Sequence, residues 1–143
     1  MKYQTSFNMN IKMYSKVAKA AHRTGKTMSE LIIEMMYRYA KDHKGTSIAK
    51  GTVKYQSADK KENWTIFRIA LDEDDYELFT DMRKVFKCSV SFLVALAIKK
   101  YLGTILRTFF QDAINYTRLK YSAKGIRAGD LAEWVFTWIL TRL

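Results

Sequence analysis

The sequence predicts a mainly α-helical fold in which a two-stranded antiparallel β-ribbon lies over four helices, with additional C-terminal helices. Three observations predict this fold. An alternating segment at 2–10 is followed by two stretches with helical periodicity. The same order of segments returns at 64–102. A chain of 143 residues with 48% hydrophobic and 14% aromatic residues is also long and apolar enough to bury a core.

The first strand is expected in KYQTSFNMN, residues 2–10, where side chains of a strand point alternately to two faces. The face expected in the core carries Thr5, Phe7 and Met9. The outward face carries Gln4, Ser6 and Asn8. Amide and hydroxyl groups are neutral and both donate and accept hydrogen bonds, so this face is suited to recognition by hydrogen bonding.

Two helices are expected after this strand. Asn10 can cap the first, of about 14 residues, and Gly25 can end it. Its expected buried positions are Tyr14, Val17, Ala18 and Ala21. The second begins at TMSE, a capping box in which Thr27 accepts a first-turn N–H and Glu30 reaches back. Its expected buried stripe is Leu31, Ile32, Met35, Met36 and Tyr39.

A shift of 62 positions aligns this first segment with the second and reveals an internal repeat. The aligned pairs include Phe7 with Ile69, Met9 with Leu71, Ser29 with Ser91, Leu31 with Leu93 and Tyr39 with Tyr101. We therefore expect a first unit at 1–43, a polar linker at 44–61, a second unit at 62–102 and a helical extension at 103–143.

One strand and two short helices cannot bury their apolar faces alone, so each unit needs a partner. The simplest partner is the other unit of the same chain, which makes an intrachain pseudo-dimer; exchange between two chains is the alternative. Pairing of the strands turns four apolar side chains inward: Phe7, Met9, Ile69 and Leu71. It leaves Gln4, Ser6 and Asn8 outside beside Ile66, Arg68 and Ala70.

The charge indicates a polyanionic partner. The net charge is +11, and residues 1–61 hold 13 Lys and Arg against 4 Asp and Glu. No apolar run approaches the roughly 18 residues that span a membrane, so nucleic acid is expected rather than a membrane. The single cysteine, Cys88, and an N-terminus without an apolar signal core indicate a cytoplasmic protein.

At 3–40 and 64–102 the chain resembles the ribbon-helix-helix family of DNA-binding proteins, which includes the Arc and MetJ repressors. The resemblance lies in KYQTSFNMN, GKTMSEL, FRIALDEDDYELF and SVSFL. It implies two tandem units whose ribbon enters the major groove of double-stranded DNA. The implied base-reading residues are Gln4, Ser6, Asn8 and Arg68. The implied phosphate-binding residues are Lys26, Thr27 and Met28 in one unit and Ser89, Val90 and Ser91 in the other.

Side-chain chemistry agrees with these roles. Gln and Asn can bond adenine, and Arg can bond guanine, through two atoms at once. Helix N-termini present free N–H groups to phosphates. Sequence-independent phosphate contacts are expected from five cations: Lys12, Lys16, Lys19, Arg23 and Lys26.

The second unit departs from the family pattern. Ile66 and Ala70 offer bases no side-chain hydrogen bond, although either can touch a thymine methyl group. The acidic run at 72–75 suits a helix N-terminus, with Asp72 as cap. It lacks the glycine turn and later glutamate of a calcium loop, so we expect no metal there.

No catalytic or cofactor-binding motif is evident, and we expect neither enzyme activity nor a cofactor. His22, His43 and Cys88 lie apart in the sequence, without zinc-ligand spacing. A final amphipathic helix carries Trp134 and Trp138, which either pack on the chain's own core or bind a protein partner or second copy.

Three functions fit these observations. The first is a sequence-specific transcriptional repressor. The second is an accessory or architectural DNA-binding protein of a plasmid or relaxosome. The third is an antitoxin-like protein-binding module whose ribbon supplies autoregulation.

Overall fold

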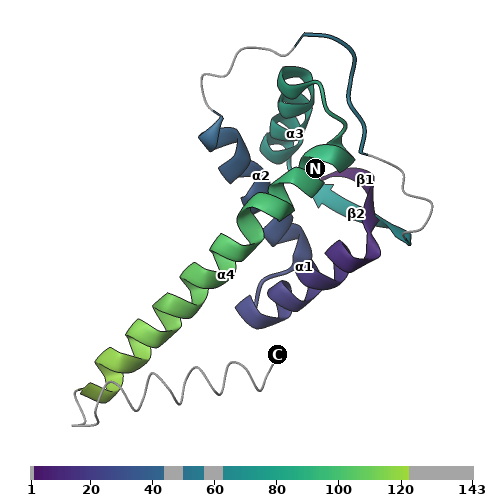
Figure 1. Ribbon diagram of the computed structural model, residues 1–143. Coiled ribbons are helices and arrows are strands. Elements are labelled where there is room, and N and C mark those ends of the chain that lie inside the picture. Colours follow the sequence, from purple (N-terminus) through teal and green to yellow (C-terminus); the bar gives the residue numbers. More distant parts are fainter. Residues whose placement is uncertain (1, 44–49, 57–62, 123–143) are drawn as a thin grey trace. The chain divides into compact units, whose positions relative to one another are not determined.

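The computed structural model describes residues 2–43, 50–56 and 63–122, with side chains as far as residue 112. Its elements are β1 (Tyr3–Asn10), α1 (Ile11–Thr24), α2 (Met28–Asp42), β2 (Trp64–Leu71), α3 (Glu73–Phe86) and α4 (Val90–Ser122) (Figure 1). The expectation of a mainly helical protein with a small two-stranded antiparallel sheet is confirmed. The chain divides into two compact units, one ending at Leu102 and the other beginning at Gly103.

β1 and β2 lie side by side and pair along their full lengths, with Phe7 opposite Phe67 (Figure 1). The side chains alternate as expected from the sequence. The inward face buries Phe7, Met9, Ile69 and Leu71 almost completely. Thr5, which was expected beside them, is half-buried. This apolar face joins the ribbon to the helices, because burying it removes large side chains from water.

Local capping determines where the first two helices begin and end. The Lys12 N–H donates to Asn10 Oδ1 (2.8 Å) at the start of α1, and Gly25 ends that helix in the left-handed conformation. Thr27 and Glu30 form the reciprocal capping box at the start of α2. The capping predictions are therefore confirmed, as is the length of 14 residues for α1.

The second strand is followed by two helices with matching bounds. α3 begins and ends 62 residues after α1, and α4 begins 62 residues after α2. Asp72 Oδ1 accepts the Asp75 N–H (2.8 Å) as the cap of α3, and Ser89 Oγ accepts the Phe92 N–H (3.2 Å) as the cap of α4. The C-cap of α3, Lys87, adopts the left-handed conformation of its counterpart Gly25. The internal repeat is therefore present in secondary structure as well as in sequence.

The helices bury equivalent positions of both copies. The buried pairs are Leu31 with Leu93, Ile32 with Val94, Met35 with Ala97 and Met36 with Ile98. On α1, the expectation that Tyr14 and Ala18 are buried is wrong: Tyr14 is 36% exposed and Ala18 is half-buried, whereas Ala20 is buried. The Tyr14 ring meets Phe67 at a centroid distance of 6.3 Å, so it covers the rim of the core rather than its centre.

α4 does not end at Gly103 but continues to Ser122, so the start of the extension expected at 103–143 is one helix with the end of the second unit. Ile105 is buried and Phe109 is half-buried on this part of the helix. Trp134 and Trp138 lie outside the described residues. Across 2–43, 50–56 and 63–122, no helix is long and apolar enough to cross a membrane.

Candidate nucleic-acid interface

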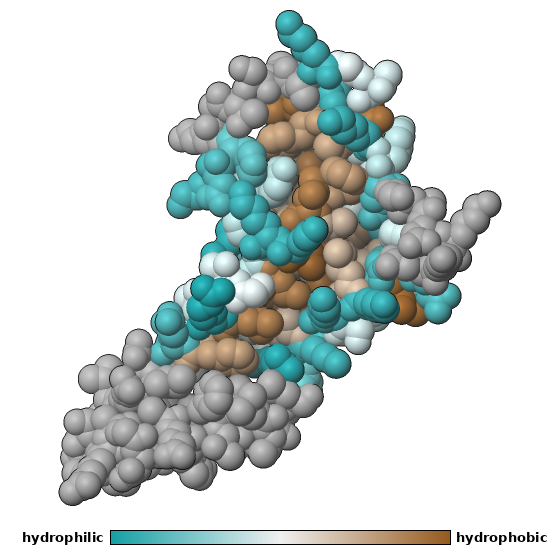
Figure 2. Space-filling model, in the orientation of Figure 1, coloured by the Kyte–Doolittle hydropathy of each residue, from teal (hydrophilic) through white to brown (hydrophobic). Residues whose placement is uncertain are grey.

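The face of the molecule shown in Figure 2 carries apolar side chains over its centre, with hydrophilic side chains on both sides. Phosphate groups bind cations and hydrogen-bond donors, so an apolar centre is not suited to holding DNA. The outer face of the ribbon is a different kind of surface, because its side chains are polar or exposed and none of them belongs to the core.

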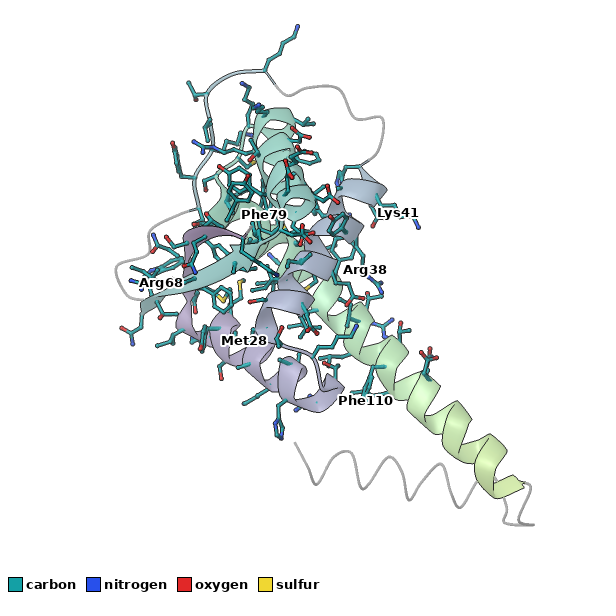
Figure 3. The ribbon with its side chains drawn as sticks, turned by 180° about the vertical axis from the view of Figure 1, so that it is seen from behind. Met28, Arg38, Lys41, Arg68, Phe79 and Phe110 are labelled. Carbon is teal, nitrogen blue, oxygen red and sulfur yellow. The ribbon has the colours of Figure 1, made fainter. Side chains whose placement is uncertain are left out.

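The outer face of the ribbon presents six side chains, all exposed: Gln4, Ser6, Asn8, Ile66, Arg68 and Ala70. In the register, Ser6 lies directly opposite Arg68. These two residues are also counterparts in the sequence repeat, 62 positions apart. Figure 3 shows Arg68 at the margin of the molecule, on the side of the ribbon away from α2. The structure therefore brings the four predicted base-reading residues onto one open face.

The main-chain N–H and carbonyl of Asn8 that face away from β2 both form hydrogen bonds within the protein. Its N–H donates to Ser91 Oγ (3.0 Å), and its carbonyl accepts a hydrogen bond from Gln56 Nε2 (2.9 Å). Edge strands normally leave such groups open to another chain. Here they are satisfied within the protein while the Asn8 side chain remains exposed.

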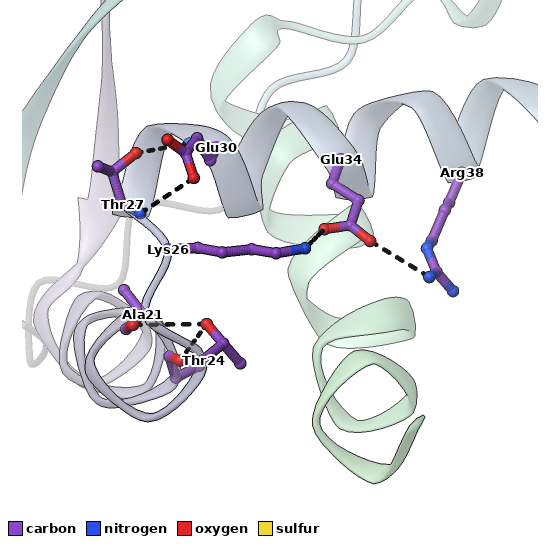
Figure 4. A network of polar contacts seen from close by, with 8 residues as sticks. Ala21, Thr24, Lys26, Thr27, Glu30, Glu34 and Arg38 are labelled. Carbon is purple, nitrogen blue, oxygen red and sulfur yellow. Dashed lines mark hydrogen bonds and ion pairs between the residues drawn. The ribbon is translucent and has the colours of Figure 1, made fainter. Parts of the chain in front are cut away.

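The start of α2 is the first predicted phosphate-binding position (Figure 4). Lys26 Nζ lies 3.0 Å from Glu34 Oε2, and Arg38 lies 3.3 Å from the other carboxylate oxygen of Glu34. The Lys26 side chain is 45% exposed, and ion pairs of this kind contribute only about 0–1 kcal/mol. Lys26 can therefore exchange Glu34 for a phosphate at small cost. Thr27 is exposed and Met28 is half-buried.

The start of α4 is the second predicted phosphate-binding position, and its serines already have structural partners. Ser89 Oγ caps the helix, and the Ser89 N–H donates to the carbonyl of Lys54 (2.9 Å). Ser91 Oγ accepts the Asn8 N–H. Both hydroxyl groups act as acceptors in these contacts, so their hydrogens remain able to bond a phosphate oxygen. Val90 is half-buried beside them.

Charge differs sharply between the two copies. α1 contains Lys12, Lys16, Lys19 and Arg23 and no acidic residue. α3 contains five acidic residues and two basic ones. Lys12 of the first copy corresponds to Asp74 of the second, and both side chains are exposed. The positive charge is therefore concentrated on the first helix of the first copy.

Two of the four acidic residues at 72–75, before and at the start of α3, have structural roles. Asp72 caps the helix, and Asp75 Oδ1 accepts the Tyr37 hydroxyl hydrogen (2.8 Å) from α2. This hydrogen bond, with a contribution from burial, raises the pKa of Tyr37 to about 12. Within the part of the chain that the structure describes, no three His, Cys, Asp or Glu side chains gather to hold a metal ion.

The three residues considered for catalysis occupy different places. His22 is exposed on α1. His43 stacks on Tyr39 at the end of α2, with ring centroids 4.2 Å apart. Cys88 is buried in the turn before α4, where burial raises the pKa of its thiol.

Lys54 and Gln56 lie in the segment expected to be a polar linker, yet both make structural contacts. Lys54 forms a parallel bridge with Cys88, and Gln56 holds Asn8. The alternation of Val53, Lys54, Tyr55 and Gln56 is a strand pattern that could have indicated this docking. The pattern is short and follows two glycines of the linker, Gly45 and Gly51, which favoured the interpretation as a loop.

Comparison of the chain with protein-family models, curated proteins and solved structures finds no match.

Proposed function

We propose that this chain is a sequence-specific double-stranded DNA-binding protein, a cytoplasmic transcriptional repressor built as a tandem ribbon-helix-helix pseudo-dimer. Its ribbon enters the major groove. The observation that carries the proposal is the open ribbon face, on which all six outward side chains are exposed around the Ser6 and Arg68 pair. A face built for packing would bury such groups, and a face built only for solubility would not need its edge held at Asn8.

The dimensions and the chemistry of the face fit the major groove. That groove is about 12 Å wide and admits a two-stranded ribbon. Arg68 suits guanine, because its guanidinium can donate to O6 and N7 together, and the amides of Gln4 and Asn8 suit adenine. Each such pair discriminates against a wrong base by about 1–3 kcal/mol.

The two halves of the ribbon are unequal, which favours an asymmetric site. Gln4 lies opposite Ala70, and Asn8 lies opposite Ile66. Each cross-strand pair thus joins an amide to an apolar side chain, and Ile66 is 63% exposed and can contact a thymine methyl group. The basic residues of α1 contribute phosphate contacts to the DNA backbone in one half-site only.

The proposal is tested by selecting bound fragments from a randomised duplex pool at two salt concentrations. We expect one short motif with unequal half-sites, and a Gln4→Ala, Asn8→Ala double variant that folds normally but loses the preference for it. Gln111→Ala, an exposed amide far along α4, is the matched control and should select the same motif. If the double variant also selects that motif, the base-reading assignment is wrong.

The pairing of two units within one chain is tested by light scattering, which should give a monomer of 16.7 kDa in the absence of DNA. A dimer that dissociates only on unfolding would instead favour exchange of units between chains.

A second candidate is an accessory, architectural DNA-binding protein. It is favoured by Ile66 and Ala70, whose side chains cannot hydrogen-bond bases, and by the concentration of DNA-phosphate-binding cations on α1. Binding that is strong at low salt, enriches no motif and bends the duplex would support this candidate over a repressor.

A further inference from the structure

The segment between the two copies docks onto the second copy at the edge of the ribbon. The Lys54 N–H donates to the carbonyl of Lys87 (2.7 Å), and the carbonyl of Lys54 accepts the Ser89 N–H (2.9 Å). These are main-chain bonds, so they hold the segment in place whatever side chain residue 54 carries.

A second anchor joins the same segment to β1. Gln56 Nε2 donates to the carbonyl of Asn8 (2.9 Å), and Asn8 in turn bonds Ser91. Side chains two residues apart in an extended segment point to the same side, so Lys54 and Gln56 share the side that faces these contacts. Lys54 is nevertheless exposed. The main chain of Lys54 is therefore fixed beside the ribbon, and its side chain remains accessible to solvent.

The repeat shows what this lysine replaces. Lys26 precedes the N-cap of α2, and the residue at the equivalent position before α4 is Cys88, which is buried and uncharged. The second copy thus lacks the cation of the first. Lys54 forms its bridge with Cys88 itself, and its charge opposes the rise that burial causes in the pKa of the thiol. The connecting segment brings a cation to the position where the second copy has lost one.

We propose that Lys54 is a phosphate-contacting residue of the DNA-binding surface, supplied by the connecting segment to the half-site of the second copy. The inference rests on the proposed function and extends it: the segment at 50–56 is part of the interface rather than a passive linker. Three observations support it: the main-chain bridge, the Gln56 anchor beside Asn8, and the exchange of Lys26 for Cys88 in the repeat.

The test compares Lys54→Ala with the wild-type chain, using the duplex most enriched in the selection described above. Loss of one phosphate contact reduces the slope of log K against log salt by about 0.9, which corresponds to roughly fivefold weaker binding at 0.15 M salt. Lys54→Arg keeps the cation and should bind like the wild type. Lys50→Ala removes an exposed lysine of the same segment and is the matched control for net charge.

The outcomes separate this inference from the proposed function. If the wild type binds and Lys54→Ala has the same affinity and slope, or Lys50→Ala loses as much, the inference is overturned while DNA binding stands. If the wild type binds no duplex at either salt concentration, the proposed function and the inference fail together. Circular dichroism of Lys54→Ala should match the wild type, since both bonds of the bridge are main-chain bonds.

Discussion

Lys87→Gly is expected to stabilise the protein, whereas Gly25→Ala is expected to destabilise it, although the two residues are counterparts in the repeat. Both end the first helix of their copy with positive φ, 70° at Gly25 and 52° at Lys87. A residue with a Cβ atom is strained in this conformation by roughly 1–2 kcal/mol, and glycine is not. The second copy therefore carries a strain that the first avoids.

The magnitudes follow from two opposing terms. Lys87→Gly relieves roughly 1–2 kcal/mol of backbone strain in the folded state. Glycine also raises the conformational entropy of the unfolded chain, which lowers stability by about 0.4–1 kcal/mol. The net gain is about 0.5–1 kcal/mol. A Cβ atom added at Gly25 would have no atom within 4 Å, so the backbone conformation alone decides the sign there, and we expect a loss of about 1 kcal/mol.

Urea unfolding followed by circular dichroism measures both effects, and a change of 1 kcal/mol corresponds to about 4–8 °C in Tm for a unit of this size. Gly103→Ala is the control: this glycine lies within α4 with equal space around it, so the substitution should stabilise the helix by about 1 kcal/mol. A Lys87→Gly variant less stable than the wild type would refute the assignment of strain to this turn.

Three further results are expected. Leu31→Ala and Leu93→Ala, at equivalent fully buried positions, should each lower the free energy of unfolding by about 2–5 kcal/mol in urea titrations; a negligible effect of either would mean that its copy does not contribute to the core. Thr27→Ala should cost roughly 0.5–2 kcal/mol by the same assay, since it removes the capping box. Because the pKa of Tyr37 is raised from 10.0 to about 12, its hydrogen bond to Asp75 contributes fully below pH 10 and is lost as pH rises to 12. Tyr37→Phe should flatten the fall of stability over that interval, and an unchanged pH profile would contradict the role of this bond.

Features set by neighbouring residues could be predicted from the sequence. The caps at Asn10, Gly25 and Thr27 depend on side chains one to four residues away, and all three are found where the sequence places them. The alternation of Phe7 and Met9 on β1 is equally local and is confirmed. Apolar periodicity thus predicted the ribbon, the positions of the first helices and most of the core.

Features that depend on contacts distant in sequence were missed or misplaced. Tyr14 follows the helical stripe, yet it is exposed and its ring meets Phe67 of the other copy, 53 positions away in the sequence. Gln56 reaches Asn8 across 48 positions, and no local pattern specifies that partner. The hydrogen bond from the Asn8 N–H to Ser91 Oγ, across 83 positions, could not be predicted for the same reason.

Dimethyl sulfate footprinting of guanine N7 on the selected duplex tests the proposed contact between the open ribbon face and base edges in the major groove. Arg68 lies opposite Ser6 near the middle of the ribbon, so the wild type should protect a guanine near the centre of the bound site. Arg68→Ala should expose that guanine while leaving the outer contacts protected. Guanines that stay reactive throughout the site, or a footprint that Arg68→Ala does not change, would contradict the claim.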